Sequence, residues 1–137
     1  MASKHSRRRS KGRSESGSFV ALQHNVLEHE QYAMLPMRAV KLLIDIYAQY
    51  RGSNNGDLCA TWSMMKKRGW KSQDTLSKAL SDLINRGWLV LTRQGGRHQA
   101  SLYAVTFKGI DECDGKLDRA ANPAPLNYWK LGYNPEI

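Results

Sequence analysis

A short loop in this sequence gathers side chains that donate hydrogen bonds. Residues 92–103 read TRQGGRHQASLY and separate two runs of strand-forming residues, 88–91 and 102–107. A hairpin that only reverses the chain needs as few as two residues. This loop is longer and carries long polar donors, which are Arg93, Gln94, Arg97, His98 and Gln99. We expect its Gly95-Gly96 pair to supply the unusual backbone angles of the turn, and the donors to reach for a ligand.

The positive charge of the chain is concentrated in two segments. The sequence has 21 Lys and Arg against 12 Asp and Glu, a net charge of +9. Residues 1–18 contain six basic residues and one Glu, and residues 58–109 contain nine basic residues and two Asp. The segments between and after them are slightly acidic. Such an uneven excess favours a surface for a polyanion over the alternative of a merely solvated face.

Catalytic and metal-binding patterns are weak. The two cysteines form no CxxC motif and the four histidines form no cluster, which favours a reducing cytosol and no zinc site. Residues 63–66 match the S-x-x-K pattern, but neither of its partner motifs follows. We expect neither an enzyme nor a cofactor. No apolar run approaches 18 residues, so we expect a cytoplasmic, nucleoid-associated protein without a membrane partner.

The composition divides the chain into three parts. Residues 1–18 have almost no apolar side chains and are predicted to be a disordered, basic, polyanion-binding arm or, alternatively, a solubilising tail. Residues 19–109 contain the regular elements and form the predicted domain. Residues 110–137 are irregular, rich in Pro and aromatic residues, and should fold back on the domain or dock a partner.

The elements of the domain are marked by apolar period and caps. A short helix should be capped by Asn25, and a second should begin with Pro36 in its first turn. A short strand at 58–60 precedes a helix capped by Thr61. Another helix is capped by Ser72 and turns its apolar side chains inward, which are Leu76, Ala79, Leu80, Leu83 and Ile84. The three longer helices should end at the Arg-Gly pairs 51–52, 68–69 and 86–87.

This order of elements resembles the winged helix-turn-helix fold, an α+β domain with a three-helix core and a C-terminal β-hairpin wing. The resemblance rests on Thr61–Gly69, the turn Trp70–Ser72, the helix Gln73–Arg86, the hairpin Trp88–Phe107 and the pattern NNGDL…GW.S..TL..AL..L...GWL..TRQGGR. The predicted domain is similar to the winged modules of phage and plasmid replication initiators and of small bacterial regulators.

The resemblance implies that the helix after Ser72 enters the major groove of DNA while the wing contacts backbone or minor groove. Base reading should fall to Gln73, Thr75 and Lys78, while Asp74 and Asp82 should face a cytosine amine, a basic neighbour or solvent. The residues expected to contact DNA are Lys71, Ser72, Gln73, Thr75, Lys78, Arg93, Gln94, Arg97, His98 and Gln99, with Arg7, Arg8 and Arg9 of the arm.

The expected function is therefore double-stranded DNA binding, as a transcriptional regulator or a replication-origin-binding protein of a bacterial mobile element. The alternative is a winged-helix adaptor that binds a protein and no DNA. The C-terminal segment is the expected contact for a second copy or for a protein partner.

Overall fold

The computed structural model describes residues 17–137 of the chain. Residues 1–16, which contain Arg7, Arg8 and Arg9 and nearly all of the predicted basic arm, lie outside the described residues.

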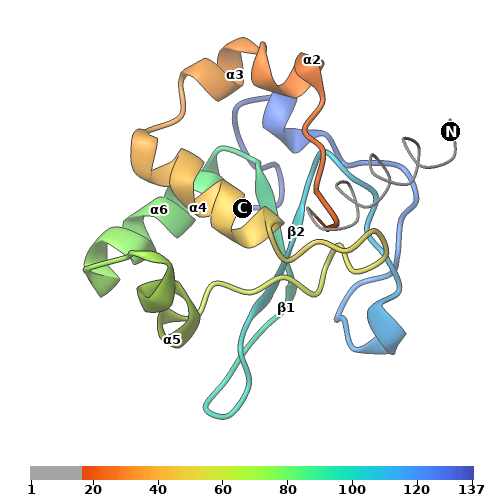
Figure 1. The fold of residues 1–137 in the computed structure, drawn as a ribbon. Coiled ribbons are helices and arrows are strands. Elements are labelled where there is room, and N and C mark those ends of the chain that lie inside the picture. Colours follow the sequence, from red (N-terminus) through yellow and green to blue (C-terminus); the bar gives the residue numbers. More distant parts are fainter. Residues whose placement is uncertain (1–16) are drawn as a thin grey trace, which may run out of the picture.

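The described chain has a mixed α+β fold (Figure 1). Its α-helices are α2 (His24–Leu27), α3 (Glu30–Ala33), α4 (Met37–Tyr47), α5 (Trp62–Met65) and α6 (Gln73–Asn85). Its strands are β1 (Leu89–Arg93) and β2 (Leu102–Val105), and its 3-10 turns are η1 (Lys66–Arg68), η2 (Cys113–Gly115) and η3 (Tyr128–Lys130). The strands pair antiparallel as a hairpin. The strand predicted at 58–60 is reduced to a single bridge, between Leu58 and Tyr103.

Two of the predicted helix starts are confirmed. The hydroxyl of Thr61 accepts a hydrogen bond from the Met64 N–H at 3.4 Å, and that of Ser72 accepts one from the Thr75 N–H at 3.2 Å. The predicted Asn25 cap is wrong, because α2 begins at His24 after Gln23, and Asn25 lies inside it. Pro36 is the residue before α4 rather than its first residue. Its ring fixes φ at −58° and its carbonyl accepts the first helical hydrogen bonds.

Two of the three Arg-Gly pairs end a helix as predicted. Gly69 follows η1 with φ of 96° and Gly87 follows α6 with φ of 84°, which is the left-handed conformation that glycine adopts without strain. The prediction for Gly52 is wrong, because α4 ends at Tyr47 and passes through turns before reaching it. Gly52 serves the following loop instead, where its carbonyl accepts a hydrogen bond from the Tyr50 hydroxyl.

One main hydrophobic core joins the helices to the hairpin. α4 packs on α6, and α6 packs on β1. The largest side chains that are completely buried are Trp88, before β1, and Trp129, in η3. The Trp129 ring lies 5.1 Å from the Trp88 ring and 4.8 Å from the His29 ring, centroid to centroid. The C-terminal segment therefore folds back and contributes its own tryptophan to the core, beside α2 and α3.

The C-terminal segment and the loop at 53–57 also hold the hairpin in place. The Asn134 side chain and the Asp118 N–H donate to the carbonyls of Leu89 and Thr92, at 3.4 and 2.8 Å. The buried Asn55 amide donates to the Gly109 carbonyl at 2.7 Å and accepts from the Val105 N–H at 2.9 Å. These bonds occupy backbone groups that a two-stranded sheet leaves unpaired at its edges. The hairpin is thus braced at its base.

In the part of the chain that the structure describes, no helix has both the length and the apolar character needed to cross a membrane.

Candidate nucleic-acid interface

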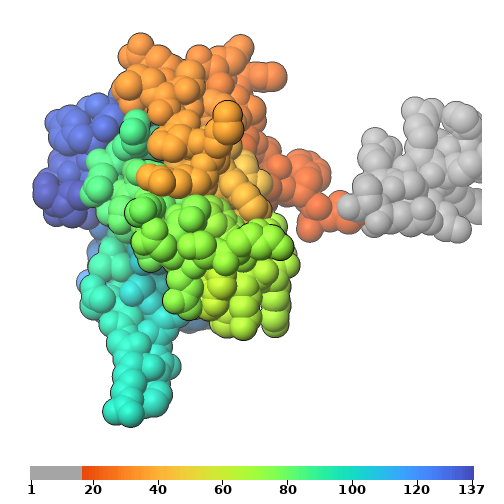
Figure 2. Space-filling model, turned by 90° about the vertical axis from the view of Figure 1, so that its left-hand side faces the viewer, coloured from red at the N-terminus to blue at the C-terminus, as the bar shows by residue number. Residues whose placement is uncertain are grey.

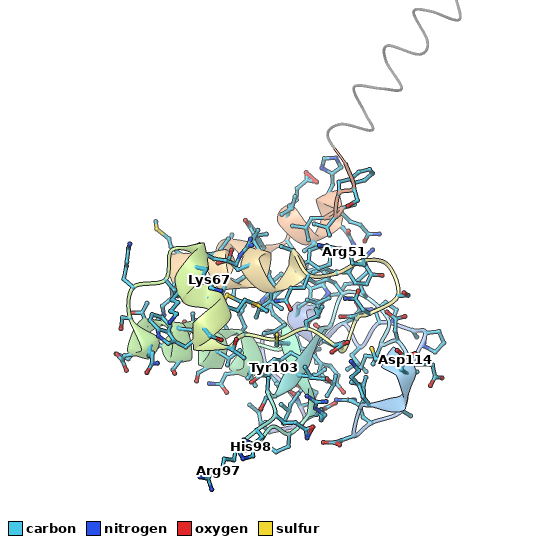
Figure 3. The ribbon with its side chains drawn as sticks, turned by 60° about the horizontal axis from the view of Figure 1, so that its bottom comes forward. Arg51, Lys67, Arg97, His98, Tyr103 and Asp114 are labelled. Atoms are coloured by element: carbon cyan, nitrogen blue, oxygen red, sulfur yellow. The ribbon has the colours of Figure 1, made fainter. Side chains whose placement is uncertain are left out.

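The tip of the hairpin presents two side chains with hydrogen-bond donors to solvent. Gly96 and Gln99 form an antiparallel bridge, so Arg97 and His98 are the two residues of the turn. Both are exposed, and Figure 3 shows them at the end of the hairpin, pointing away from the body of the molecule. Their side chains have no hydrogen-bond or ion-pair partner among residues 17–137. Their donors are therefore available to a ligand.

The glycines of this loop act differently from the expectation. Neither Gly95 nor Gly96 has a positive φ, so the prediction that they supply unusual turn angles is wrong. A Cβ at Gly95 would lie 2.4 Å from the Ser101 nitrogen and 2.6 Å from the Gln99 carbonyl oxygen. Gly95 is required because the two arms of the hairpin approach too closely for a side chain. The space beside Gly96 is open.

The hairpin is irregular beside Thr92, where hydrogen bonds join it to neighbouring segments of the chain. A bulge lies between Leu91 and Arg93, where the Thr92 hydroxyl donates to the Gly56 carbonyl at 2.6 Å. The exposed Gln94 donates its N–H to the Asp118 carboxylate at 2.9 Å. A bulge increases local twist and re-aims the strand, so these bonds fix the direction in which the tip projects.

Arg93 differs from the other predicted hairpin residues. It is half-buried, and its Nη2 donates to the Ala100 carbonyl on the opposite arm at 3.0 Å. Its Nε is buried and has no partner among the described residues. Arg93 therefore joins the two arms, whereas Arg97, His98 and Gln99 lie exposed at the tip.

The predicted residues of α6 lie at its exposed N-terminal end. Lys71, Gln73 and Thr75 are exposed, and the Lys71 and Gln73 side chains have no partner within residues 17–137. The Ser72 hydroxyl accepts the capping hydrogen bond. Lys78 is paired with Asp74 one turn earlier, with 2.9 Å between Nζ and Oδ2. The Lys78 ammonium has three donors, so Asp74 leaves some of them free for a base or a phosphate.

The sequence predicts that Asp74 and Asp82 face a cytosine amine, a basic neighbour or solvent, and each of them pairs with a basic neighbour. Besides the Asp74–Lys78 pair, Asp82 accepts from Arg38 Nε of α4 at 2.8 Å. Both acids of residues 58–109 are thus paired, and among the described residues no ion pair compensates the charges of Lys66, Lys67, Lys71 and Arg97.

Four further exposed residues lie on or beside these elements and are not among the residues expected to contact DNA, although the helical period of 73–86 also places Ser81 outward. Ser77 and Ser81 lie on the outward side of α6, away from the buried Leu76, Ala79 and Leu83. Lys66 and Lys67 lie on η1, and Figure 3 labels Lys67 there. The helical period already places Ser77 outward, and the run KKR at 66–68 adjoins the turn before α6. These signals were sufficient to find all four.

The helix and the hairpin tip are accessible from one side. In Figure 2 the segment from α5 to α6, in lime and green, covers the centre of the face turned to the viewer, and the hairpin projects below it. A ligand on this side meets a helix with short serines at its middle, lysines at its start and an extended arm beside it. This arrangement suits a long polyanion with a groove that admits a helix.

Within residues 17–137, no three His, Cys, Asp or Glu side chains group in a way that could hold a metal ion. Compared with models of protein families, with curated proteins and with solved structures, the chain matches none of them.

Proposed function

We propose that residues 19–109 form a winged helix-turn-helix domain that binds double-stranded DNA and catalyses no reaction. The observation that carries this proposal is the exposed Arg97-His98 turn, whose side chains have no partner among residues 17–137, at the end of a braced hairpin beside the open face of α6. α6 has 13 residues and is about 20 Å long, and the major groove of DNA, about 12 Å wide, admits such a helix.

Each part of the surface has a separate role in this proposal. Gln73, Thr75 and Lys78 read base edges, because amide, hydroxyl and ammonium groups match them. The short Ser77 and Ser81 let the helix backbone approach the groove floor. The lysines at 66, 67 and 71 and the wing tip contact phosphates, which position the protein without reading sequence.

The biological setting that we propose is a transcriptional regulator or a replication-origin-binding protein of a bacterial mobile element, with residues 1–18 adding general attraction to DNA. A second copy or a protein partner would contact the C-terminal segment. This segment leaves Leu131 and Tyr133 half exposed, at 50% and 56% of their full area. An adaptor that binds no DNA is the competing function.

Titration of the full chain with a labelled duplex of random sequence tests the proposal. Non-specific binding by a basic DNA-binding domain has a Kd of about 10⁻⁴–10⁻⁶ M at physiological salt and weakens steeply as salt rises. Lys71→Ala should weaken it, while Lys130→Ala removes one exposed charge from η3 and serves as the matched control. Absence of binding, or equal effects of the two substitutions, would contradict the proposed interface and favour the adaptor.

A further inference from the structure

A buried carboxylate connects α4 to the turn that precedes α6. Asp45 lies on α4 and is only 6% exposed. Its Oδ2 accepts hydrogen bonds from the Trp70 indole Nε1 at 2.8 Å and from Lys41 Nζ at 3.0 Å. Its Oδ1 accepts one from Arg68 Nε at 3.0 Å. Two of these donors come from η1 and the turn, so the carboxylate bridges separate parts of the chain.

Lys41 strengthens the same connection. Its ammonium group also donates to the Arg68 carbonyl at 2.9 Å and lies 5.7 Å from the centre of the Trp70 ring. The backbone N–H of Trp70 in turn donates to the Met65 carbonyl. Every partner of Asp45 is thus held by at least one further contact or lies on the same helix. The turn Gly69–Ser72 has little freedom to shift along α4.

The ionised form of Asp45 is the one that fits this site. Burial alone opposes ionisation, but the hydrogen bonds from Trp70, Lys41 and Arg68 outweigh it and lower the pKa of the Asp45 carboxyl below its ordinary value. Replacing the carboxylate by an amide would turn one of its two acceptor oxygens into a donor. Either the Arg68 guanidinium, or the Trp70 indole and the Lys41 ammonium, would then lose this acceptor. The site is therefore built around a carboxylate.

The direct contacts between α4 and α6 do not fix direction in the same way as the bonds from Asp45 to η1 and the turn. Their facing side chains are mainly apolar, and apolar burial is non-directional. The Arg38–Asp82 pair is a polar link between these two helices in the described chain, but its carboxylate side chain is 20% exposed, whereas that of Asp45 is 8% exposed. Exposed ion pairs contribute little. The directional hydrogen bonds of Asp45 hold Arg68 and Trp70, just before the Ser72 cap of α6.

We propose that Asp45 is a positioning residue that sets the orientation of α6 and thereby the ability of the protein to discriminate between DNA sequences. This inference rests on the proposed function for its DNA part. Asp45 itself is buried behind the surface and contacts no DNA. It acts through Trp70 and Arg68, which fix the N-terminal end of the helix that carries Gln73 and Thr75.

Asp45→Asn and Trp70→Phe test the inference in the full chain. The first removes the charge at constant shape, and the second keeps an apolar ring but removes one donor. The matched control is Glu136→Gln. Glu136 also accepts three hydrogen bonds, two from Arg119 at 2.9 Å and one from the Tyr128 hydroxyl at 3.0 Å, and the pKa of its carboxyl is also lowered. It lies outside the α4–α6 connection.

Hydrogen exchange measured residue by residue provides a readout that needs no DNA. The amides of Trp70, Thr75 and Leu76 donate to acceptors in the protein. Both test variants should speed their exchange by about tenfold or more, because local opening becomes easier, and leave β1 and β2 unchanged. Glu136→Gln should not affect these amides. Unchanged exchange in the turn, or an equal increase throughout the chain, would overturn the inference. If Asp45→Asn does not fold, Trp70→Phe decides the matter in the same way.

The DNA readout is the ratio of affinities for a selected site and for its scrambled sequence. Asp45→Asn should lower this ratio by about tenfold, roughly the value of one good base contact, while general affinity for DNA is retained. A ratio equal to that of Glu136→Gln would overturn the role in discrimination. If no variant and no parent binds DNA, the proposed function fails, and the exchange experiment still decides whether Asp45 positions α6.

Discussion

Replacing Arg97 and Arg93 by Ala should have different consequences, although the two residues are four positions apart in one hairpin. Arg97 is exposed and has no partner among the described residues, so Arg97→Ala should change the free energy of unfolding by less than about 0.5 kcal/mol. If the Arg97 guanidinium contacts one phosphate, its loss reduces the steepness of log affinity against log salt by about 0.9. Between 50 and 200 mM salt, the parent should therefore lose about 3.5 times more affinity than the variant.

Arg93 instead donates to the Ala100 carbonyl from a half-buried position. Arg93→Ala should lower the free energy of unfolding by about 1–2 kcal/mol, the contribution of a partly screened charged hydrogen bond, and affect the salt slope little. Fluorescence anisotropy of a labelled duplex at several salt concentrations, combined with urea unfolding, measures both quantities. Arg97→Lys is the control and should keep the parent's slope. An unchanged slope in Arg97→Ala would refute the assignment of the tip, and a reduced slope with unchanged stability in Arg93→Ala would refute its internal role.

Three further predictions concern the core, the arm and acid. Trp129→Ala should lower the free energy of unfolding by about 3–5 kcal/mol, measured in urea, because the buried ring packs on Trp88 and His29. Leu131 is half exposed, so Leu131→Ala should lower the free energy of unfolding far less. Equal decreases in the two variants would show that the C-terminal segment is not part of the core. Deleting residues 1–18 should weaken binding to every DNA sequence while preserving their ranking, and a reordered ranking would mean that the arm reads sequence. The lowered pKa values of the Asp45 and Glu136 carboxyls stabilise the fold above the ordinary carboxyl pKa of about 4. This stabilisation is lost as pH falls through the lowered values. Unfolding measured against pH should therefore show a shallower acid loss in Asp45→Asn than in the parent, and identical pH curves would contradict the linkage.

The features that the sequence predicts correctly depend on local chemistry. The caps at Thr61 and Ser72 and the glycine ends at Gly69 and Gly87 each require only a few neighbouring residues. The hairpin follows from two strand-forming runs around a polar loop. By contrast, α2 and α3 have four residues each, which is too short for an apolar period to mark their ends.

The features that escape prediction depend on contacts between distant residues. Trp129 is recognisable as apolar, but its position between His29 and Trp88 depends on three separate segments. Arg93 and Arg97 are alike in sequence, but Arg93 follows a bulge and bonds across the hairpin to Ala100. Leu80, predicted to face inward, is only partly buried, whereas Leu83 is completely buried. The role of Asp45 has no local signal, since its partners Arg68 and Trp70 lie more than 20 residues away.

Selection of binding sites from a random duplex library is the most direct test of the central claim that α6 reads DNA. The full chain is selected beside Gln73→Ala, Thr75→Ala and Lys78→Ala, three changes at exposed positions of α6. The proposal predicts that the parent enriches a defined motif. At least one of the variants should then lose discrimination at one or two base pairs, at about 1–3 kcal/mol for a good bidentate contact, while keeping non-specific affinity. If the parent enriches no motif, or if all three variants enrich the parent's motif at full strength, α6 does not read DNA sequence.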